Sequence, residues 1–131
     1  AIKLKTLTEW FSRYSYDVQQ VMQVDGQILR GELLSVKGVG PETADSILLY
    51  ALNKPFFVVD TYTKRILYRL GYDLPNTYDG LRLKIEEGIP HDIYLYGEFH
   101  ALIVEHAKRH CKKNPSCEAC SVESVCKKRI E

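Results

Sequence analysis

Long apolar runs are missing from this sequence: no segment approaches the roughly 18 consecutive apolar residues that a membrane-spanning helix requires. The first residues, AIKLKTLTEW, form an amphipathic stretch without the cleavage pattern of a signal peptide. The alternation of apolar and polar residues that is typical of β-strands is also missing, as are internal repeats and low-complexity linkers. These absences exclude a helical membrane protein and predict an intracellular, all-α protein.

The sequence also lacks an excess of charge of either sign, since 18 Lys and Arg residues are balanced by 17 Asp and Glu residues, for a net charge of +1. The distribution is uneven: residues 108–131 carry seven basic and three acidic side chains, and residues 1–107 carry 11 and 14. A basic end on a mildly acidic body suits either a nucleic-acid surface or a solvated tail. The chain of 131 residues has the length of one domain.

The segment LLSVKGVGPETADSILLYA, residues 33–51, predicts two helices joined by a tight glycine turn. Gly38 and Gly40 permit backbone conformations that cost other residues energy, and Pro41 suits the first position of a helix. Free N–H groups at a helix start bind phosphate oxygens without reading base sequence. The segment is therefore a candidate DNA-backbone clamp, although the same pattern also suits a plain connection between packed helices.

Apolar spacing and capping residues predict the other helices. We expect helices over residues 3–14, 17–22 (with Asp17 as N-cap), 61–70 (ended by Gly71), 76–87 and 92–110. The residues expected on inner faces are Leu4, Leu7 and Phe11 in the first helix, Ala44, Ile47, Leu48 and Ala51 after the glycine turn, and Leu95, Phe99, Leu102, Ile103 and His106 in the last.

Asp60 follows the short apolar run at residues 56–59 and precedes the 61–70 helix. Aspartate is strongly preferred as an N-cap, so a purely structural role is one interpretation of this residue. First-turn N–H groups and the positive helix end both favour the ionised carboxylate. We therefore expect the pKa of Asp60 to lie below its ordinary value.

Four cysteines are confined to a short C-terminal segment, where Cys111, Cys117, Cys120 and Cys126 read C-x5-C-x2-C-x5-C. This spacing is compatible with two disulfides, a zinc site or an iron–sulfur cluster. Disulfides are disfavoured in an intracellular protein. Four thiolates suit both Zn²⁺ and [4Fe–4S], and the spacing alone does not separate them. The sequence therefore predicts one metal centre with four cysteine ligands.

Taken together, the Gly38-Val39-Gly40-Pro41-Glu42-Thr43 turn, the Val59-Asp60-Thr61 sequence and the cysteines resemble the helix-hairpin-helix–GPD superfamily of DNA glycosylases, which includes endonuclease III. The resemblance covers residues 27–126. It implies a helical glycosylase core at residues 1–110, with the helix-hairpin-helix at 27–51, and an iron–sulfur cluster loop with a basic tail at 111–131. The family's first cysteine loop is one residue longer than the loop in this chain.

The resemblance also assigns the site. Asp60 matches the catalytic carboxylate, the four cysteines match the ligands of a [4Fe–4S] cluster (with Zn²⁺ as the alternative), and the partner is double-stranded DNA with a damaged or mispaired base. The DNA-backbone clamp would comprise Lys37, Gly38, Val39, Gly40, Glu42 and Thr43. Lys112, Lys113, Lys127 and Lys128, around the cluster, either face phosphates or merely solubilise the protein.

The activity implied is hydrolysis of the N-glycosidic bond of a base flipped out of the duplex, with Asp60 stabilising positive charge on the deoxyribose. Bifunctional members carry a nucleophilic Lys where this chain has Glu42, and a carboxylate cannot form an imine. We therefore expect a monofunctional enzyme, most similar to the branch that removes alkylated purines such as 3-methyladenine. The aromatic residues available for a base pocket are Trp10, Tyr62, Tyr94, Tyr96 and Phe99.

Two alternatives remain open: a bifunctional endonuclease III-type glycosylase and lyase for oxidised pyrimidines, and a noncatalytic helix-hairpin-helix module. In each case we expect a cytoplasmic, nucleoid-associated monomer. The chain lacks an initiator Met and begins within a predicted helix, and the family's first helices precede this region. We therefore expect the C-terminal portion of a longer protein, incomplete as an enzyme.

Overall fold

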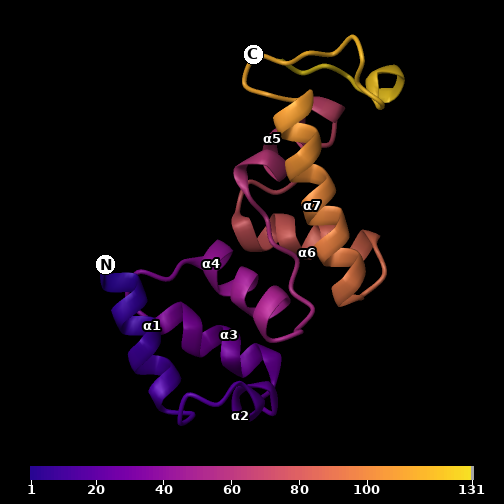
Figure 1. Ribbon diagram of the computed structural model, residues 1–131. Helices are drawn as coiled ribbons and strands as arrows, with labels where there is room; N and C mark the ends of the chain where they lie inside the picture. Colours follow the sequence, from indigo (N-terminus) through magenta and orange to yellow (C-terminus); the bar gives the residue numbers. More distant parts are fainter. Residues whose placement is uncertain (131) are drawn as a thin grey trace.

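The computed structural model describes residues 1–130, and all regular structure in that range is helical (Figure 1). The elements in chain order are α1 (Ile2–Ser12), α2 (Val18–Met22), α3 (Gly26–Ser35), α4 (Pro41–Ser46), the π-helix η1 (Ile47–Ala51), α5 (Thr61–Leu70), α6 (Tyr78–Gly88), α7 (Ile93–Arg109) and the 3-10 helix η2 (Glu123–Val125). The predicted all-α class is confirmed. Within residues 1–130, no helix has the length and apolar character needed to span a membrane.

Helix boundaries follow the capping residues. The side chains that accept first-turn N–H groups are Asp17 before α2, Asp25 before α3, Asp60 before α5, Thr77 before α6 and Asp92 before α7. At the other end of α5, Gly71 has a φ of 117°, a left-handed conformation that favours glycine. The predicted N-cap at Asp17 and the predicted helix end at Gly71 are both confirmed.

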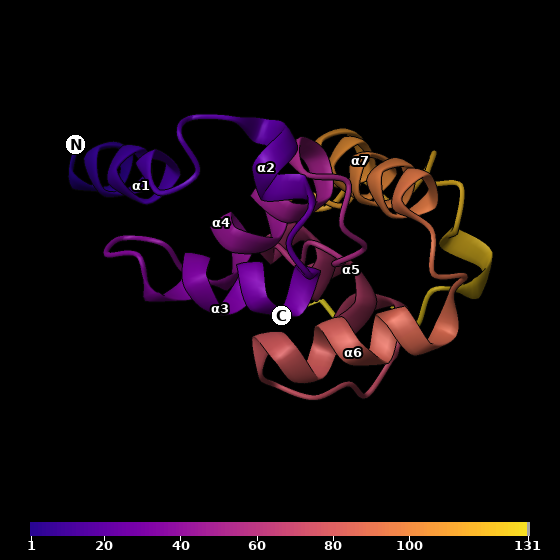
Figure 2. The ribbon, with the colours of Figure 1, turned by 90° about the horizontal axis from the view of Figure 1, so that it is seen from below.

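The helices form two lobes, with α1 to α4 and η1 in one and α5 to α7 in the other (Figure 1). Seen from below, α1 lies at the edge farthest from α6 and α7 (Figure 2). Neighbouring residues are divided between the two cores: Leu48 and Phe56 pack in the first, whereas Leu49 and Phe57 pack in the second. The second half of the hairpin and the extended run after it therefore join the lobes.

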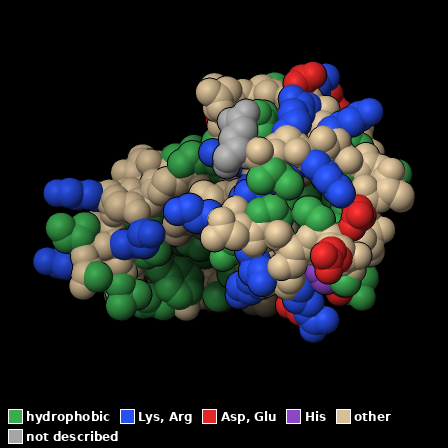
Figure 3. Space-filling view, turned by 90° about the horizontal axis from the view of Figure 1, so that it is seen from above, with side chains coloured by type: hydrophobic (Ala, Val, Ile, Leu, Met, Phe, Trp, Pro, Cys, Tyr) green, Lys and Arg blue, Asp and Glu red, His purple; other side chains and the backbone are tan. Residues whose placement is uncertain are grey.

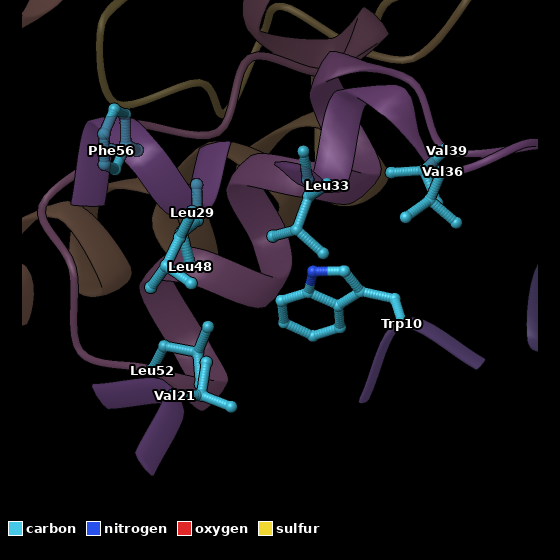
Figure 4. Packing of buried hydrophobic residues seen from close by; sticks show 10 residues of the cluster. Trp10, Val21, Leu29, Leu33, Val36, Val39, Leu48, Leu52 and Phe56 are labelled. Carbon is cyan, nitrogen blue, oxygen red and sulfur yellow. The ribbon is translucent and has the colours of Figure 1, made fainter. Parts of the chain in front are cut away.

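The first core forms where α1 packs against the hairpin helices (Figure 4). Its buried residues include Trp10, Leu29, Leu33 and Leu48, and the Trp10 indole N–H donates to Glu32 Oε1 at 2.9 Å. Burial of this many apolar side chains, each contributing about 1.5–3 kcal/mol, fixes the position of the glycine turn against α1.

The prediction of an inward-facing side chain is wrong for three residues. Leu4 is 71% exposed, because the buried residue of α1 is Trp10. Ala51 is exposed and Leu49 is buried, since the α-helix widens to π geometry from Ile47 and the apolar stripe shifts with it. Leu102 is 62% exposed, and the fully buried position of α7 is Tyr96. In each case tertiary packing selected a neighbouring face of the helix.

Candidate active site and cysteine segment

The hairpin turn has the predicted backbone geometry. Gly38 has a φ of 92°, Pro41 occupies the first turn of α4, and Gly40 caps that helix without a side chain. The first-turn amides of α4 therefore receive no side-chain acceptor from the N-cap, which suits an oxygen ligand such as a phosphate. The Val39 N–H donates to Val36 O at 3.1 Å, so this amide serves the turn itself.

Helix α1 lies against the turn. The Thr6 hydroxyl donates to the Lys37 carbonyl oxygen at 2.7 Å, and Lys3 Nζ donates to Thr43 Oγ1 at 3.3 Å. Among the predicted clamp residues, Val39 is 7% exposed and packs in the first core, whereas the side chains of Lys37 and Glu42 are exposed. The Val39 side chain thus fixes the turn to the first core, while the other clamp side chains stay at the surface.

Asp60 is the N-cap of α5, as its sequence position predicts. Its Oδ1 accepts both the Thr63 N–H and the Thr63 hydroxyl, each at 2.8 Å. Its Oδ2 lies 3.1 Å from His100 Nε2, and the two side chains are 12% and 17% exposed. Burial by itself would raise the pKa of Asp60, but the hydrogen bonds from His100 and Thr63 outweigh it and lower the pKa below its ordinary value.

A chain of hydrogen bonds continues from Asp60 to the lobe formed by α1 to α4 and η1. His100, on α7, contacts the Tyr50 hydroxyl of η1 through Nδ1 at 2.7 Å. Burial and the charge of Asp60 raise the pKa of Tyr50, which keeps the phenol protonated. Sequence reasoning gave neither His100 nor Tyr50 a role. No local signal marks them, because 40 residues separate His100 from Asp60 and 50 separate it from Tyr50.

The other end of α5 holds the cysteine segment. Arg69, which is 7% exposed, donates to the carbonyl oxygens of Lys112 at 2.6 Å and Lys113 at 3.0 Å. Arg65 Nε donates to the Cys111 carbonyl oxygen at 3.0 Å, and the Lys127 N–H donates to Leu70 O at 3.1 Å. One helix therefore carries Asp60 at its start and fixes both ends of the cysteine segment at its finish.

All four cysteines line one cavity between α5, α7 and the C-terminal segment, and none forms a disulfide in residues 1–130. Nitrogen atoms approach three of the sulfurs: Arg69 Nη1 lies 3.4 Å from Cys111, His106 Nε2 lies 3.4 Å from Cys120, and the Lys128 N lies 3.3 Å from Cys126. In residues 1–130 no three His, Cys, Asp or Glu side chains are arranged to hold a single metal ion.

Four free thiols on one cavity are the residue types that a group with four thiolate ligands requires, and the Cys126 sulfur also lies 3.2 Å from Arg69 O. Cluster-bound thiolates are negatively charged and are stabilised by N–H donors, which are also the contacts that tune the reduction potential of an iron–sulfur centre. His106, expected to be a hydrogen-bonded core residue, is partly buried and contacts Cys120. Its burial and, to a smaller extent, the charge of the nearby His110 lower its pKa.

The aromatic residues considered for a base pocket are mostly committed elsewhere. Trp10 packs in the first core, and Tyr96 and Phe99 surround Phe57 in the second. Tyr62 is half-buried with the Arg65 guanidinium 5.3 Å from its ring centroid. Tyr94, 75% exposed, lines an open groove together with Tyr50. Within residues 1–130, these side chains do not form one aromatic pocket.

Comparison with known proteins confirms that the hairpin is a helix-hairpin-helix motif. The family model described as the helix-hairpin-helix motif matches residues 30–50. A protein of Methanocaldococcus jannaschii, named as a DNA repair glycosylase, is 44% identical over 129 residues, which cover 96% of this chain and 59% of that protein. These matches support the resemblance of the chain to the helix-hairpin-helix–GPD superfamily of DNA glycosylases.

Two solved structures share the fold. The crystal structure of H. pylori 3-methyladenine DNA glycosylase bound to 1,N6-ethenoadenine has a TM-score of 0.70 and 31% identity, over 82% of this chain and 54% of that one. A noncovalent endonuclease III–DNA complex has a TM-score of 0.68 at 20% identity, over 95% of this chain and 74% of that one, and supports the fold alone. The chain thus spans only part of the glycosylases it matches.

Proposed function

We propose that this chain is the DNA-contacting and catalytic part of a base-excision-repair glycosylase, with Asp60 as its catalytic carboxylate. The observation that carries the proposal is the environment of Asp60: an ionised carboxylate at a helix start, bonded by Thr63 and His100 and linked through Tyr50 to the hairpin lobe. The named activity of its superfamily relatives supports the same reaction. Double-stranded DNA with a damaged base is the proposed partner.

The chemistry follows from charge. As the N-glycosidic bond breaks, positive charge develops on the deoxyribose, and a fixed anion beside the sugar stabilises it. The hydrogen bonds from Thr63 and His100 hold Asp60 ionised and oriented, so it needs no rearrangement when the charge develops. The clamp residues Lys37, Gly38, Gly40, Glu42 and Thr43 would hold the DNA backbone, with Val39 as their anchor.

Replacing Asp60 by Asn tests this role. Asn also caps helices well, so the fold should persist while the charge is lost. We expect single-turnover excision of an alkylated purine from duplex DNA to fall about 100-fold or more. The matched control is Asp92→Asn, because Asp92 caps α7 in the same way through the Leu95 N–H at 3.0 Å. Equal losses in both variants would contradict a catalytic role for Asp60.

A binding assay keeps this test independent of turnover. A duplex carrying a cationic pyrrolidine in place of the target sugar resembles the charged transition state, and a tetrahydrofuran duplex is its neutral counterpart. We expect wild-type protein to prefer the cationic duplex and Asp60→Asn to lose that preference. A noncatalytic helix-hairpin-helix module would bind both duplexes equally, with or without Asp60.

Glu42 bears on the second chemical step. It stands at the exposed start of α4, at the position that carries the Schiff-base Lys in bifunctional members, and it offers no nucleophilic amine. We propose a monofunctional enzyme that leaves an intact abasic site. Borohydride reduction during turnover should trap no covalent protein–DNA adduct. Trapping of an adduct would instead favour the endonuclease III-type glycosylase and lyase for oxidised pyrimidines.

Alkylated purines are the proposed substrate class, because the structural relative at 31% identity is named as a 3-methyladenine DNA glycosylase. Such bases carry positive charge and leave readily, so a carboxylate without a strong general acid is sufficient for their departure. Competition between duplexes bearing an alkylated purine and an oxidised pyrimidine measures the preference.

Cys111, Cys117, Cys120 and Cys126 are the proposed ligands of a [4Fe–4S] cluster, which makes residues 111–131 a loop attached to the core at residues 1–110. When bound, the cluster would supply a rigid cross-link and a redox-active centre. Arg69 and Arg65 position the loop whatever it binds. We expect the purified protein to absorb broadly in the visible range and to contain about four irons per chain. One zinc per chain and no colour would contradict the cluster.

A further inference from the structure

We propose that His100 is a positioning residue for the carboxylate of Asp60, and that the Tyr50 hydroxyl fixes the orientation of the His100 ring. This inference rests on the proposed function, because it concerns the same carboxylate. The three side chains come from three elements, α5, α7 and η1, that meet where the two lobes join. The contacts between them are therefore determined by tertiary structure and not by local capping.

The hydrogen-bonding capacity of each group assigns the proton positions. An ionised carboxylate only accepts, so His100 Nε2 must carry the hydrogen that points to Asp60 Oδ2 at 3.1 Å. In the neutral ring, Nδ1 is then an acceptor, and the Tyr50 hydroxyl donates to it at 2.7 Å. The phenol thus selects the imidazole tautomer that donates to Asp60, as a second partner of a functional His commonly does.

The capping role of Asp60 does not need His100. Thr63 donates both of its hydrogen bonds to Oδ1, which satisfies the helix start, whereas Oδ2 receives the imidazole N–H. Oδ2 is the oxygen left over from capping and is therefore the one available to face a substrate. His100 holds this oxygen in a defined direction, since the two Thr63 bonds to Oδ1 leave the carboxylate free to pivot about Oδ1.

The local helix geometry brings Tyr50 into this arrangement. Tyr50 lies in η1, where the Leu52 N–H bonds to Ile47 O with π-helical spacing, a distortion often found at functional sites. Its ring centroid is 5.9 Å from that of His100. Because Tyr50 is 53% exposed and lines the groove shared with Tyr94, the chain of hydrogen bonds extends from a largely buried carboxylate to an accessible surface.

The test combines NMR with kinetics on the whole chain. Its variants are His100→Ala, which removes the donor, His100→Gln, whose amide can still donate to Asp60, and Tyr50→Phe. The matched control is His91→Ala, because His91 forms a similar His–Tyr pair, 2.9 Å from the Tyr96 hydroxyl and away from Asp60. The groups facing Asp60 from neighbouring elements are His100 and Tyr50, so titration of its carboxyl carbon by ¹³C NMR reports their influence directly.

We expect His100→Ala to raise the pKa of Asp60 toward its ordinary value and His100→Gln to restore the low pKa in large part. In ¹⁵N spectra, wild-type His100 should be the Nε2–H tautomer, and Tyr50→Phe should produce a mixture. Single-turnover excision should fall about 10-fold to 100-fold in His100→Ala, with DNA affinity within about twofold. The acid limb of its pH–rate profile should move to higher pH.

Several results would overturn the inference. They are an unchanged Asp60 titration in His100→Ala, an Nδ1–H tautomer in wild type, or no rescue by Gln. The NMR readouts need no turnover, so a chain that fails to excise any base still decides whether His100 and Tyr50 act on Asp60. If these readouts behave as expected while Asp60→Asn excises normally, the proposed function fails and His100 has no catalytic meaning.

Discussion

Under the proposed function, capping and catalysis are compatible roles for the one carboxylate of Asp60. One oxygen accepts both donors of Thr63 and starts α5, while the other faces His100. The Thr63 bonds that cap the start of α5, together with the bond from His100, also lower the pKa of Asp60. The carboxylate therefore stays ionised. The fold alone therefore sets both the ionisation and the side-chain orientation of Asp60.

A second carboxylate, Asp45, pairs with a buried guanidinium. It is fully buried and forms a bidentate pair with Arg30, with distances of 2.7 Å and 3.1 Å, while Arg30 also contacts the partly exposed Asp79 at 2.8 Å. Burial by itself would lower the pKa of Arg30, but Asp45 and Asp79 raise it, so the guanidinium stays charged. This pair joins α3 to α4 inside the hairpin.

Asp45→Asn therefore leaves a buried guanidinium without its main counter-charge. We expect the free energy of unfolding to fall by about 3–5 kcal/mol, as when one partner of a buried ion pair is removed. Urea unfolding followed by circular dichroism measures it. The matched control is Asp79→Asn, whose side chain is 57% exposed in the wild type, and its cost should stay below about 1 kcal/mol. Similar costs in both variants would contradict this assignment.

At the scale of elements, the hairpin turn depends on one glycine. Gly38 has a φ of 92°, and a Cβ at this position would lie 3.3 Å from the backbone of Lys3 on α1. Both the left-handed conformation and the close approach of α1 therefore require the absence of a side chain. The turn geometry and the docking of α1 are coupled through this position.

We expect Gly38→Ala to destabilise the protein by about 1–2 kcal/mol, from the left-handed backbone alone, and to weaken binding to duplex DNA. Gly31→Ala makes the same chemical change inside α3, where nothing lies within 4 Å of the new Cβ. There alanine should stabilise by about 0.5–1 kcal/mol. Thermal unfolding of the two variants checks the opposite signs. A stable Gly38→Ala that binds DNA normally would refute the role assigned to the turn.

The whole molecule has a net charge of only +1, so the arrangement of its charges decides how strongly it would attract the proposed DNA partner. The face at the C-terminal end shows basic side chains scattered among apolar ones, with fewer acidic side chains (Figure 3). Lys112, Lys113 and Lys127 are exposed, and Arg69 holds the segment that carries the first two through their carbonyl oxygens. A fixed segment holds its charges at defined positions, which a solvated tail does not.

Salt dependence distinguishes a phosphate-facing surface from a solubilising one. Each phosphate contact contributes about 0.9 to the slope of log K against log salt, so replacing both Lys112 and Lys113 by Ala should reduce the slope by about 1.8. Lys84→Ala is the control, since Lys84 pairs with Glu87 on the exposed side of α6. Binding titrations across a salt series give the slopes. An unchanged slope in the double variant would identify these lysines as solubilising only.

Local chemistry in the sequence determined most of the helices and the resemblance to a known superfamily. Capping side chains such as Asp17 and Asp60, and breakers such as Pro41 and Gly71, act on their immediate neighbours, so their effects are visible in the sequence. The glycine turn, Asp60 and the cysteine spacing are also local patterns, and together they indicate the resemblance to the glycosylase superfamily.

Tertiary structure alone decided which faces are buried and which side chains meet. Leu102 and Ala51 lost their predicted inward positions because helix rotation is set by packing partners, and π geometry in η1 shifted the apolar stripe. The contact of His100 with Asp60 and Tyr50 joins residues at least 40 positions apart. Such contacts depend on how whole helices dock, and a single sequence records the helices but not their docking.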